Sequence, residues 1–440
     1  MPKSQDDVDN FGSKLHSKHG ASIRVEPTLC QRDALGFPSC VATERGRGAT
    51  VRGIEPLSDA RLALLLSLAL CCASVNAQST DRPRIRDLGI SPGIFAPGAL
   101  NAITDVAGVR VGHQTLVRDD SVRTGVTAIL PHGGNLFQEK VPAGMHAANA
   151  FGKAAGLLQI EELGLIESPI VLTNTLAVGT AIEGTVAYTL DQPGNERIQS
   201  VNAVVGETND GYLNDIRGRH VTVEDVRAAI DSASTGPVAE GNVGAGTGTV
   251  CFGWKGGIGT SSRVLPASLG GYTVGVLVQS NYDGVLVIDG VRVGEHLGQY
   301  TYRDDVAGGI AQKAHPEQGS VMIVIATDAP VDARTLERMA RRAPLGLART
   351  GSFMSNGSGD FAIAFSTQNR VPYSPTSRTQ PAEYLHNDSV SPLFLAVVEA
   401  VEEAVYNSLT RAESMTGHLG HRVEAFDVEA LRALLGKRGN

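Results

Sequence analysis

The segment Ser320–Thr327 is apolar at nearly every position (SVMIVIAT) and follows directly on a glycine. A strand that is apolar throughout is typical of a sheet covered on both faces, whereas a half-exposed strand alternates apolar with polar residues. Other runs rich in Val and Ile have the same character, and they alternate with segments of helical periodicity. The sequence therefore predicts a layered α/β fold.

The remaining elements are predicted from the same patterns. Strands are expected over residues 168–176, 201–206, 272–279, 285–293, 320–327 and 361–366, and helices over residues 147–163, 223–232, 333–348, 393–413 and 428–435. Thr222, followed by Asp225 three residues later, has the pattern of a capping box that begins the second helix. The proline- and serine-rich stretch 371–392 is predicted to be a long surface loop. Residues 78–440 are expected to form a single catalytic domain.

Composition limits the classes of partner. The chain has 440 residues with a formal net charge of −8, which argues against nucleic acid because phosphate binding requires a basic surface. Four of the five cysteines precede Ala77. Only Cys251 remains after that point, so no internal disulfide is possible in a chain that begins at residue 78. A buried, inert thiol is expected for Cys251, which lies in a glycine-rich apolar run.

The N-terminal region has the composition of a targeting segment. Arg61 precedes an apolar run over residues 62–73, and small residues follow up to Ala77. This pattern predicts a signal peptide over residues 51–77 that is cleaved after Ala77, since the run is shorter than the roughly 20 residues of a membrane span. Residues 1–50 are polar and patternless and are expected to be a non-native leader. The mature protein is then periplasmic or secreted, without stable membrane insertion.

The pair Gly319-Ser320 could carry chemistry. Cleavage before Ser320 would place a hydroxyl and a free α-amine on the first residue of a rigid strand, and glycine allows unusual backbone geometry at such a bond. An α-amine has a pKa of roughly 7.7–8.0, so it can act as a base near neutral pH without a histidine. The alternative is an ordinary turn, because glycine and serine commonly precede strands.

Two other site types are poorly supported. The stretch 241–248 (GNVGAGTG) lacks the lysine of a phosphate-binding loop and the spacing of a dinucleotide motif, so its glycines are predicted to make tight turns against neighbouring backbone. The histidines are scattered, and none has zinc-ligand spacing beside a carboxylate.

Polar side chains gather at the ends of predicted strands. Acid, amide and phenol groups follow one strand in residues 205–215, and a second group in residues 355–360 precedes another. Asn281 follows a third strand in the same way. Active sites of layered α/β folds collect at strand ends. An ordinary turn would account for any one of these polar groups. It accounts less well for all of them occurring together with Gly319-Ser320.

These segments resemble one known family, the DmpA-type self-processing aminopeptidases, which include L-aminopeptidase/D-Ala-esterase-amidases and β-aminopeptidases. The resemblance covers the chain from about residue 85 to the C-terminus. The residues that carry it are 169–175, 205–215, 241–263, 276–281, 319–320, 326–330 and 349–360. It implies a four-layer α/β/β/α sandwich similar to the N-terminal-nucleophile hydrolases. It also implies self-cleavage between Gly319 and Ser320 into an α chain (78–319) and a β chain (320–440), and a homo-oligomer of such αβ units.

The resemblance also assigns roles. Ser320 corresponds to the nucleophile, its freed α-amine to the base, and Asn281 to the oxyanion donor. Ser358 and Asp360 would bind around Ser320, with Asp360 helping to hold the substrate's ammonium group. Tyr212 would line the pocket, a role that Glu207, Asn209 or Asn214 could share. The expected substrates are short peptides, amino-acid amides or esters, and no metal or organic cofactor is implied.

One departure and two alternatives remain. Residues 147–153 (AANAFGK) contain less glycine than the family pattern, which leaves the shape of that pocket wall and the substrate preference open. An acyltransferase similar to the ornithine acetyltransferases shares the layered fold and the self-cleavage but uses threonine, so Ser320 argues against it. A non-catalytic periplasmic binding protein would keep Gly319-Ser320 as a simple turn.

Overall fold

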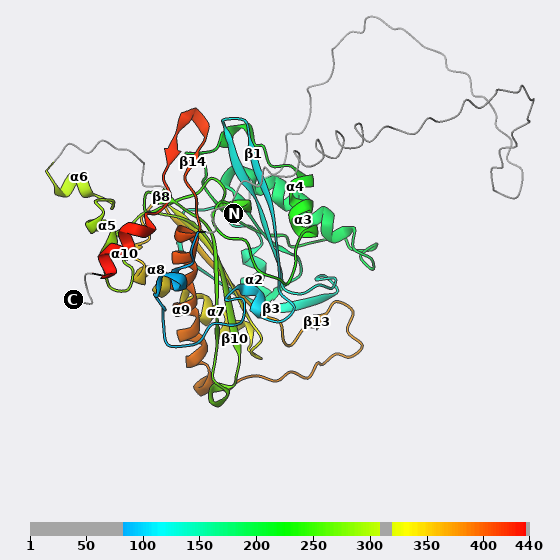
Figure 1. Ribbon diagram of the computed structural model, residues 1–440. Coiled ribbons are helices and arrows are strands. Elements are labelled where there is room, and N and C mark those ends of the chain that lie inside the picture. Colours follow the sequence, from blue (N-terminus) through cyan, green and yellow to red (C-terminus); the bar gives the residue numbers. More distant parts are fainter. Residues whose placement is uncertain (1–81, 309–318, 437–440) are drawn as a thin grey trace, which may run out of the picture. The chain divides into compact units, whose positions relative to one another are not determined.

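Strand β11 (Ser320–Thr327) lies in the middle of a mixed sheet in the computed structural model, which describes residues 82–308 and 319–436 (Figure 1). The predicted leader and signal peptide lie outside the described residues, and the predicted extent of the catalytic domain stays a prediction. The strand order is β13–β3–β12–β11–β10–β9, with β4 added to β3. The bounds are β3 Glu139–Ala150, β4 Leu165–Ile166, β9 Gly257–Val264, β10 Thr273–Asn281, β12 Gly359–Ser366 and β13 Val371–Pro372.

A second, smaller sheet has the order β1–β2–β5–β6. Its strands are β1 Arg110–Arg118, β2 Val122–Leu130, β5 Ile170–Asn174 and β6 Val204–Thr208. The first three pair antiparallel, and β6 runs parallel to β5.

The two sheets pack face to face, and β11 shows how the sequence achieves this. Successive side chains of a strand point to opposite faces. Val321, Ile323 and Ile325 join the cluster that packs against helices, whereas Met322 and Val324 join the cluster between the sheets. Both sets are fully buried, so the apolar run is explained by burial of both faces.

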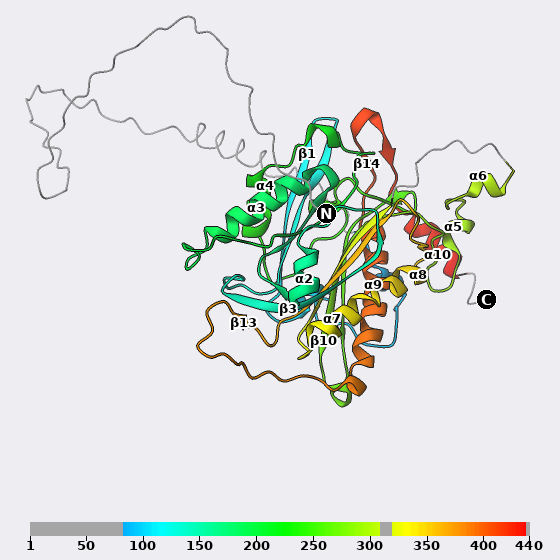
Figure 2. The same cartoon turned by 180° about the vertical axis from the view of Figure 1, so that it is seen from behind.

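Helices cover the outer face of each sheet. Helices α7 (Ala333–Ala340) and α9 (Ser391–Thr410) lie on the larger sheet, and α8 (Ala343–Arg349) packs against α9. Helices α3 (Val178–Leu190) and α4 (Val223–Asp231) lie on the smaller sheet (Figures 1 and 2). The layers are therefore helix, sheet, sheet and helix, and the predicted α/β/β/α sandwich is confirmed.

The shorter elements complete the chain. They are β7 Val250–Cys251, β8 Trp254–Lys255, β14 Met415–Thr416, β15 Arg422–Val423, α2 Leu157–Leu163, α5 Val293–His296, α6 Arg303–Val306 and α10 Val428–Gly436. Across residues 82–308 and 319–436, the structure has no helix with the length and hydropathy that a membrane crossing requires.

Several sequence predictions are confirmed. Strand β11 has the predicted bounds, and α4 begins at the predicted capping box, in which the Thr222 backbone N–H donates to the Asp225 carboxylate at 2.9 Å. Residues 371–390 form the predicted loop apart from the two-residue strand β13 and one short 3-10 turn, and the last two residues of the predicted stretch, 391–392, are the start of α9.

Two predictions are wrong in part. Residues 147–150, predicted as helix, are the end of β3, which pairs with β12 and so takes its conformation from tertiary contact rather than from its alanine-rich sequence. Residues 285–293, predicted as a strand, form one isolated bridge, between Ile288 and Val291, and Val293 is the first residue of α5.

The close approach of β9 to α9 makes a stability prediction. A Cβ atom on Gly259 would lie 1.9 Å from the carbonyl oxygen of Ala404 in α9, whereas one on Gly179 in α3 would meet no atom within 4 Å. We expect Gly259→Ala to destabilise the fold by about 1–3 kcal/mol or more. Gly179→Ala is the matched control and should be neutral or slightly stabilising, because alanine favours a helix. Thermal unfolding of both variants measures this, and equal melting temperatures would contradict the packing described.

Candidate active site

Three strand ends meet at Ser320. It is the first residue of β11 and lies opposite Asn281, the last residue of β10, and beside Gly359, the first residue of β12. Ser320 and Asn281 are 4% and 5% exposed, so the hydroxyl and the amide lie at a nearly water-free edge of the larger sheet. Segments separated by about forty residues in sequence are thus brought together by backbone pairing alone.

The carbonyl oxygen of Gly319 accepts two hydrogen bonds. The Ser320 hydroxyl donates to the Gly319 carbonyl oxygen at 2.5 Å, and the Gly359 backbone N–H donates to the same oxygen at 3.1 Å. A Cβ on residue 319 would lie 2.7 Å from the Ser358 hydroxyl oxygen. Crowding by Ser358 is therefore a reason for glycine at this position.

The amide of Asn281 is held in one orientation. Its Oδ1 accepts the backbone N–H of Val250 at 2.9 Å. The two ends of an asparagine amide are assigned from their hydrogen-bond partners. With the oxygen bound to Val250, the Nδ2 group is the end left to donate to an acceptor such as an oxyanion.

Ser358 and Asp360 form a buried pair beside Ser320. The Ser358 hydroxyl donates to Asp360 Oδ1 at 2.6 Å, and Asp360 Oδ2 is buried without a hydrogen bond from any described residue. Burial raises the pKa of the Asp360 carboxyl to about 6, and the hydrogen bond from Ser358 opposes this increase. A carboxylate with one oxygen unpartnered is suited to bind a cation.

Asn149 supports this pair, although the sequence did not single it out as a site residue. Its side-chain amide donates to the carbonyl oxygens of Ser355, at 3.0 Å, and of Ser358. Asn149 lies opposite Asp360 in the β3–β12 pairing, next to a register shift between Asp360 and Phe361. The bulge and the asparagine hold the 355–358 loop against the strand, and no local sequence pattern could reveal this.

Tyr212 lies in the loop that follows β6. Its ring stacks on His421 with centroids 4.3 Å apart, and its carbonyl oxygen binds the His421 ring at 2.8 Å. The Glu207 carboxylate accepts hydrogen bonds from the backbone N–H of Lys153, at 3.0 Å, and from the Thr175 hydroxyl. The contacts described here do not test a role of Tyr212 in the pocket, which stays a prediction.

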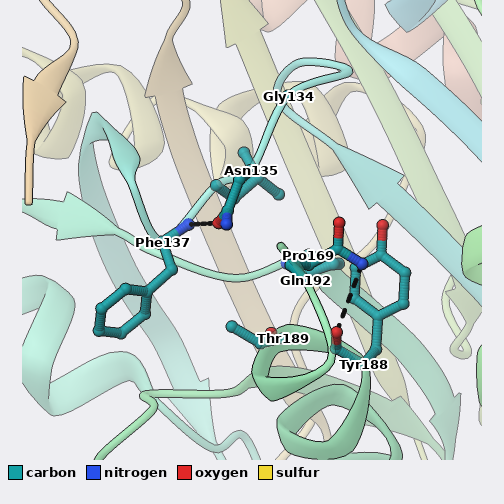
Figure 3. A pocket seen from close by; sticks show the side chains of 8 residues that line it. Gly134, Asn135, Phe137, Pro169, Tyr188, Thr189 and Gln192 are labelled. Carbon is teal, nitrogen blue, oxygen red and sulfur yellow. Dashed lines mark hydrogen bonds between the residues drawn. The ribbon is translucent and has the colours of Figure 1, made fainter. Parts of the chain in front are cut away.

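Two cavities lie elsewhere on the molecule. One, of about 10 Å³, is lined by Asn135, Phe137, Tyr188 and their neighbours (Figure 3), and it admits about one water molecule. A wider one, of about 390 Å³, is lined by Leu176, Gly179, Thr180, Gly218 and Arg219. Neither cavity is lined by Ser320, Asn281 or Asp360. Both cavities therefore lie apart from the residues at the strand ends that could carry the chemistry.

Other candidate chemistries are not supported by these contacts. Cys251 is buried, and burial raises the pKa of its thiol to about 12, so it is inert as predicted. Within the described ranges, the structure contains no cluster of three or more His, Cys, Asp or Glu residues suited to a metal ion.

Comparison with known proteins gives the family. The sequence pattern of peptidase family S58 matches residues 101–423. The chain belongs to this family. It is 43% identical over 378 residues to the beta-peptidyl aminopeptidase BapA of Sphingosinicella microcystinivorans, a match that covers 82% of this chain and 94% of that protein.

Solved structures of the family agree. The L-aminopeptidase D-Ala-esterase/amidase of Ochrobactrum anthropi, described as a prototype serine aminopeptidase with a variant of the Ntn hydrolase fold, matches with a TM-score of 0.74 and 40% identity. That match covers 81% of this chain and 99% of the other. A Burkholderia sp. beta-aminopeptidase matches with a TM-score of 0.72 and 42% identity over 81% and 99% of the two chains.

The predicted resemblance is therefore confirmed, and the chain is a hydrolase, a serine aminopeptidase of the N-terminal-nucleophile type. This assignment decides against the non-catalytic binding protein and the acyltransferase that the sequence left open. The roles of individual residues are not decided by family membership.

The Ser358–Asp360 pair makes a prediction about pH. Protonation of Asp360 at acid pH removes the charge expected to hold a substrate ammonium, so kcat/KM should fall on the acid side. Ser358→Ala removes a hydrogen bond that lowers the pKa of Asp360, so the acid limb of the kcat/KM profile should move to higher pH. Asp360→Asn should abolish this acid limb.

Ser355→Ala is the matched control, because the part of Ser355 that binds Asn149 is its backbone carbonyl. The measurement is the pH profile of kcat/KM for an amino-acid p-nitroanilide. An acid limb that persists unchanged in Asp360→Asn would exclude Asp360 as its origin.

Proposed function

We propose that the chain cuts itself between Gly319 and Ser320 and then uses Ser320 as the nucleophile of an aminopeptidase. The observation that carries this proposal is the Ser320 hydroxyl, 2.5 Å from the carbonyl oxygen of the bond to be cut. The carbonyl oxygen also accepts the Gly359 N–H at 3.1 Å, so a donor is in place where negative charge would develop.

The self-cleavage proceeds as an N-to-O acyl shift. The Ser320 Oγ attacks the Gly319 carbonyl carbon, the C–N bond breaks, and the α-amine of Ser320 is released as an ester forms. Water then hydrolyses the ester, which leaves a carboxylate on Gly319 and a free hydroxyl on Ser320. The amine becomes the base for later turnovers, since its pKa is near neutral.

Turnover on substrate repeats the chemistry with an incoming carbonyl. Ser320 Oγ attacks, Asn281 Nδ2 donates to the oxyanion, an amine leaves, and water hydrolyses the acyl-enzyme. Asp360, with one oxygen unpartnered among the described residues, binds the substrate's ammonium group. This arrangement favours removal of N-terminal residues from short peptides, amino-acid amides or esters. The names of the BapA and Burkholderia relatives support β-amino acids among the accepted residues.

Maturation and location belong to the same proposal. Residues 61–77 support export, with the mature protein periplasmic or secreted, and the family resemblance supports a homo-oligomer of αβ units.

Ser320 variants test the nucleophile and the cut together. We expect Ser320→Ala to remain uncut and inactive because no hydroxyl is left to attack. Ser320→Cys should process slowly, because a thiol is still a nucleophile. Intact mass spectrometry under denaturing conditions measures cleavage, and hydrolysis of an alanine p-nitroanilide measures activity. An active, uncut Ser320→Ala protein would reject the proposal.

Export makes a separate prediction. N-terminal sequencing of the protein from its native source should begin at Gln78 for the α chain, because cleavage is expected after Ala77. Recovery of residues 1–50 in that sample would contradict both the leader and the signal-peptide assignments.

A further inference from the structure

Lys255 is a lysine with no exposed surface. Lysine is almost never fully buried unless its charge is compensated. Its Nζ donates to the carbonyl oxygens of Gly246, at 3.0 Å, and of Gly256, at 2.8 Å. Both carbonyls belong to the glycine-rich stretch 241–256, for which the proposed chemistry has no use so far. The ammonium group thus ties the backbone at Gly246 to the backbone at Gly256.

Asp210, which is 1% exposed, is the acid whose charge acts on Lys255, and burial raises the pKa of its own carboxyl to about 7. Burial lowers the pKa of Lys255 to about 7, and the charge of Asp210 opposes this decrease. Asp210 Oδ1 accepts the Asn214 amide at 2.9 Å, while Oδ2 is buried without a hydrogen bond from any described residue. The two segments touch, because a Cβ on Gly248 would lie 2.9 Å from Asp210 Cβ.

Lys255 is linked to Asn281, the proposed oxyanion donor, through Val250. It lies opposite Val250 in the β7–β8 pairing. The backbone N–H of Val250 is the group that binds Asn281 Oδ1 and so leaves Nδ2 as the end of the amide that can donate. The Gly246 carbonyl that Lys255 holds lies four residues before Val250. A shift of this short hairpin would therefore change the orientation of the Asn281 amide.

Asp210 belongs to the loop that follows β6, two residues before Tyr212, for which a role in the pocket is predicted. Its carbonyl oxygen accepts the backbone N–H groups of Leu213 and Asn214, at 3.1 and 3.0 Å. One buried acid and one buried base therefore join the loop after β6 to the hairpin that orients Asn281.

We propose that Lys255 is a positioning residue that sets the orientation of Asn281 through the Val250 N–H. This inference rests on the proposed function of Asn281 as oxyanion donor. The inference also explains the glycine-rich stretch. Glycines let the backbone at residues 244–248 approach neighbouring segments closely, and Lys255 holds this backbone in place through the Gly246 carbonyl.

The test is a double-mutant cycle between Lys255→Met and Asn281→Ala. Asn281→Ala should lower kcat by about 100- to 1,000-fold, as for other oxyanion donors. Lys255→Met retains the length of the side chain without its charge. It should lower kcat by about 10- to 100-fold, less than complete loss of the donor, while KM changes less than about threefold. Because Lys255 acts through Asn281, adding Lys255→Met to Asn281→Ala should cost little more.

Rates are measured with alanine and β-alanine p-nitroanilides and expressed per cleaved chain, which intact mass spectrometry counts. Lys140→Met is the matched control, since Lys140 is also largely buried and paired, with Glu167. It should leave kcat close to that of the wild type. If Lys255→Met does not fold, Asp210→Asn takes its place in the cycle with the same expectation.

The outcomes separate the two proposals. A Lys255→Met enzyme with wild-type kcat, or one that loses the same factor with and without Asn281, overturns the positioning role and leaves the function of Asn281 intact. An Asn281→Ala enzyme with wild-type kcat rejects the donor role itself and the inference with it.

Discussion

The pairing of β11 with β10 on one side and β12 on the other is the constraint on which the site depends. It brings the end of β10, carrying Asn281, and the start of β12, after Ser358, to the first residue of β11. Val321, Ile323 and Ile325 pack in the layer against the helices, and Met322 and Val324 pack in the layer between the sheets. A slip of β11 by one residue would exchange side chains of different shape between these two close-packed layers. The core thus fixes the position of Ser320 as firmly as it fixes the fold.

Burial at this edge also determines how the polar groups behave. Interactions between charges and dipoles are stronger where water is excluded, and an unpaired polar group is correspondingly costly. Most polar atoms at the site accordingly have protein partners, such as Val250 for Asn281 Oδ1 and Ser358 for Asp360 Oδ1. Oδ2 of Asp360 and Oδ2 of Asp210 are among the buried polar atoms without a hydrogen-bond partner in the described residues.

Features of the fold and the site that depend on residues close together in the sequence could be predicted from it, whereas features that depend on contacts between distant segments could not. The apolar pattern of residues 320–327 and the capping box at Thr222 are local, and both were predicted correctly. The strand at residues 147–150 depends on pairing with β12, and alanine-rich sequence gives no sign of it. The resemblance to a family supplied Asn281 and Asp360 as site residues. The supports from Asn149 and Val250 come from backbone contacts across the fold, which no spacing in the sequence encodes.

The unpartnered oxygen of Asp360 links the two reactions of the proposed site. Its Oδ2 is buried without a hydrogen bond from any described residue, and burial raises the pKa of this carboxyl. In the proposed reactions, the cut gives Ser320 a free α-amine and a substrate brings an ammonium group of its own. A cation beside Asp360 lowers the pKa of its carboxyl and favours the charged form. The same carboxylate can therefore serve both the proposed new N-terminus of the β chain and the amino end of a peptide.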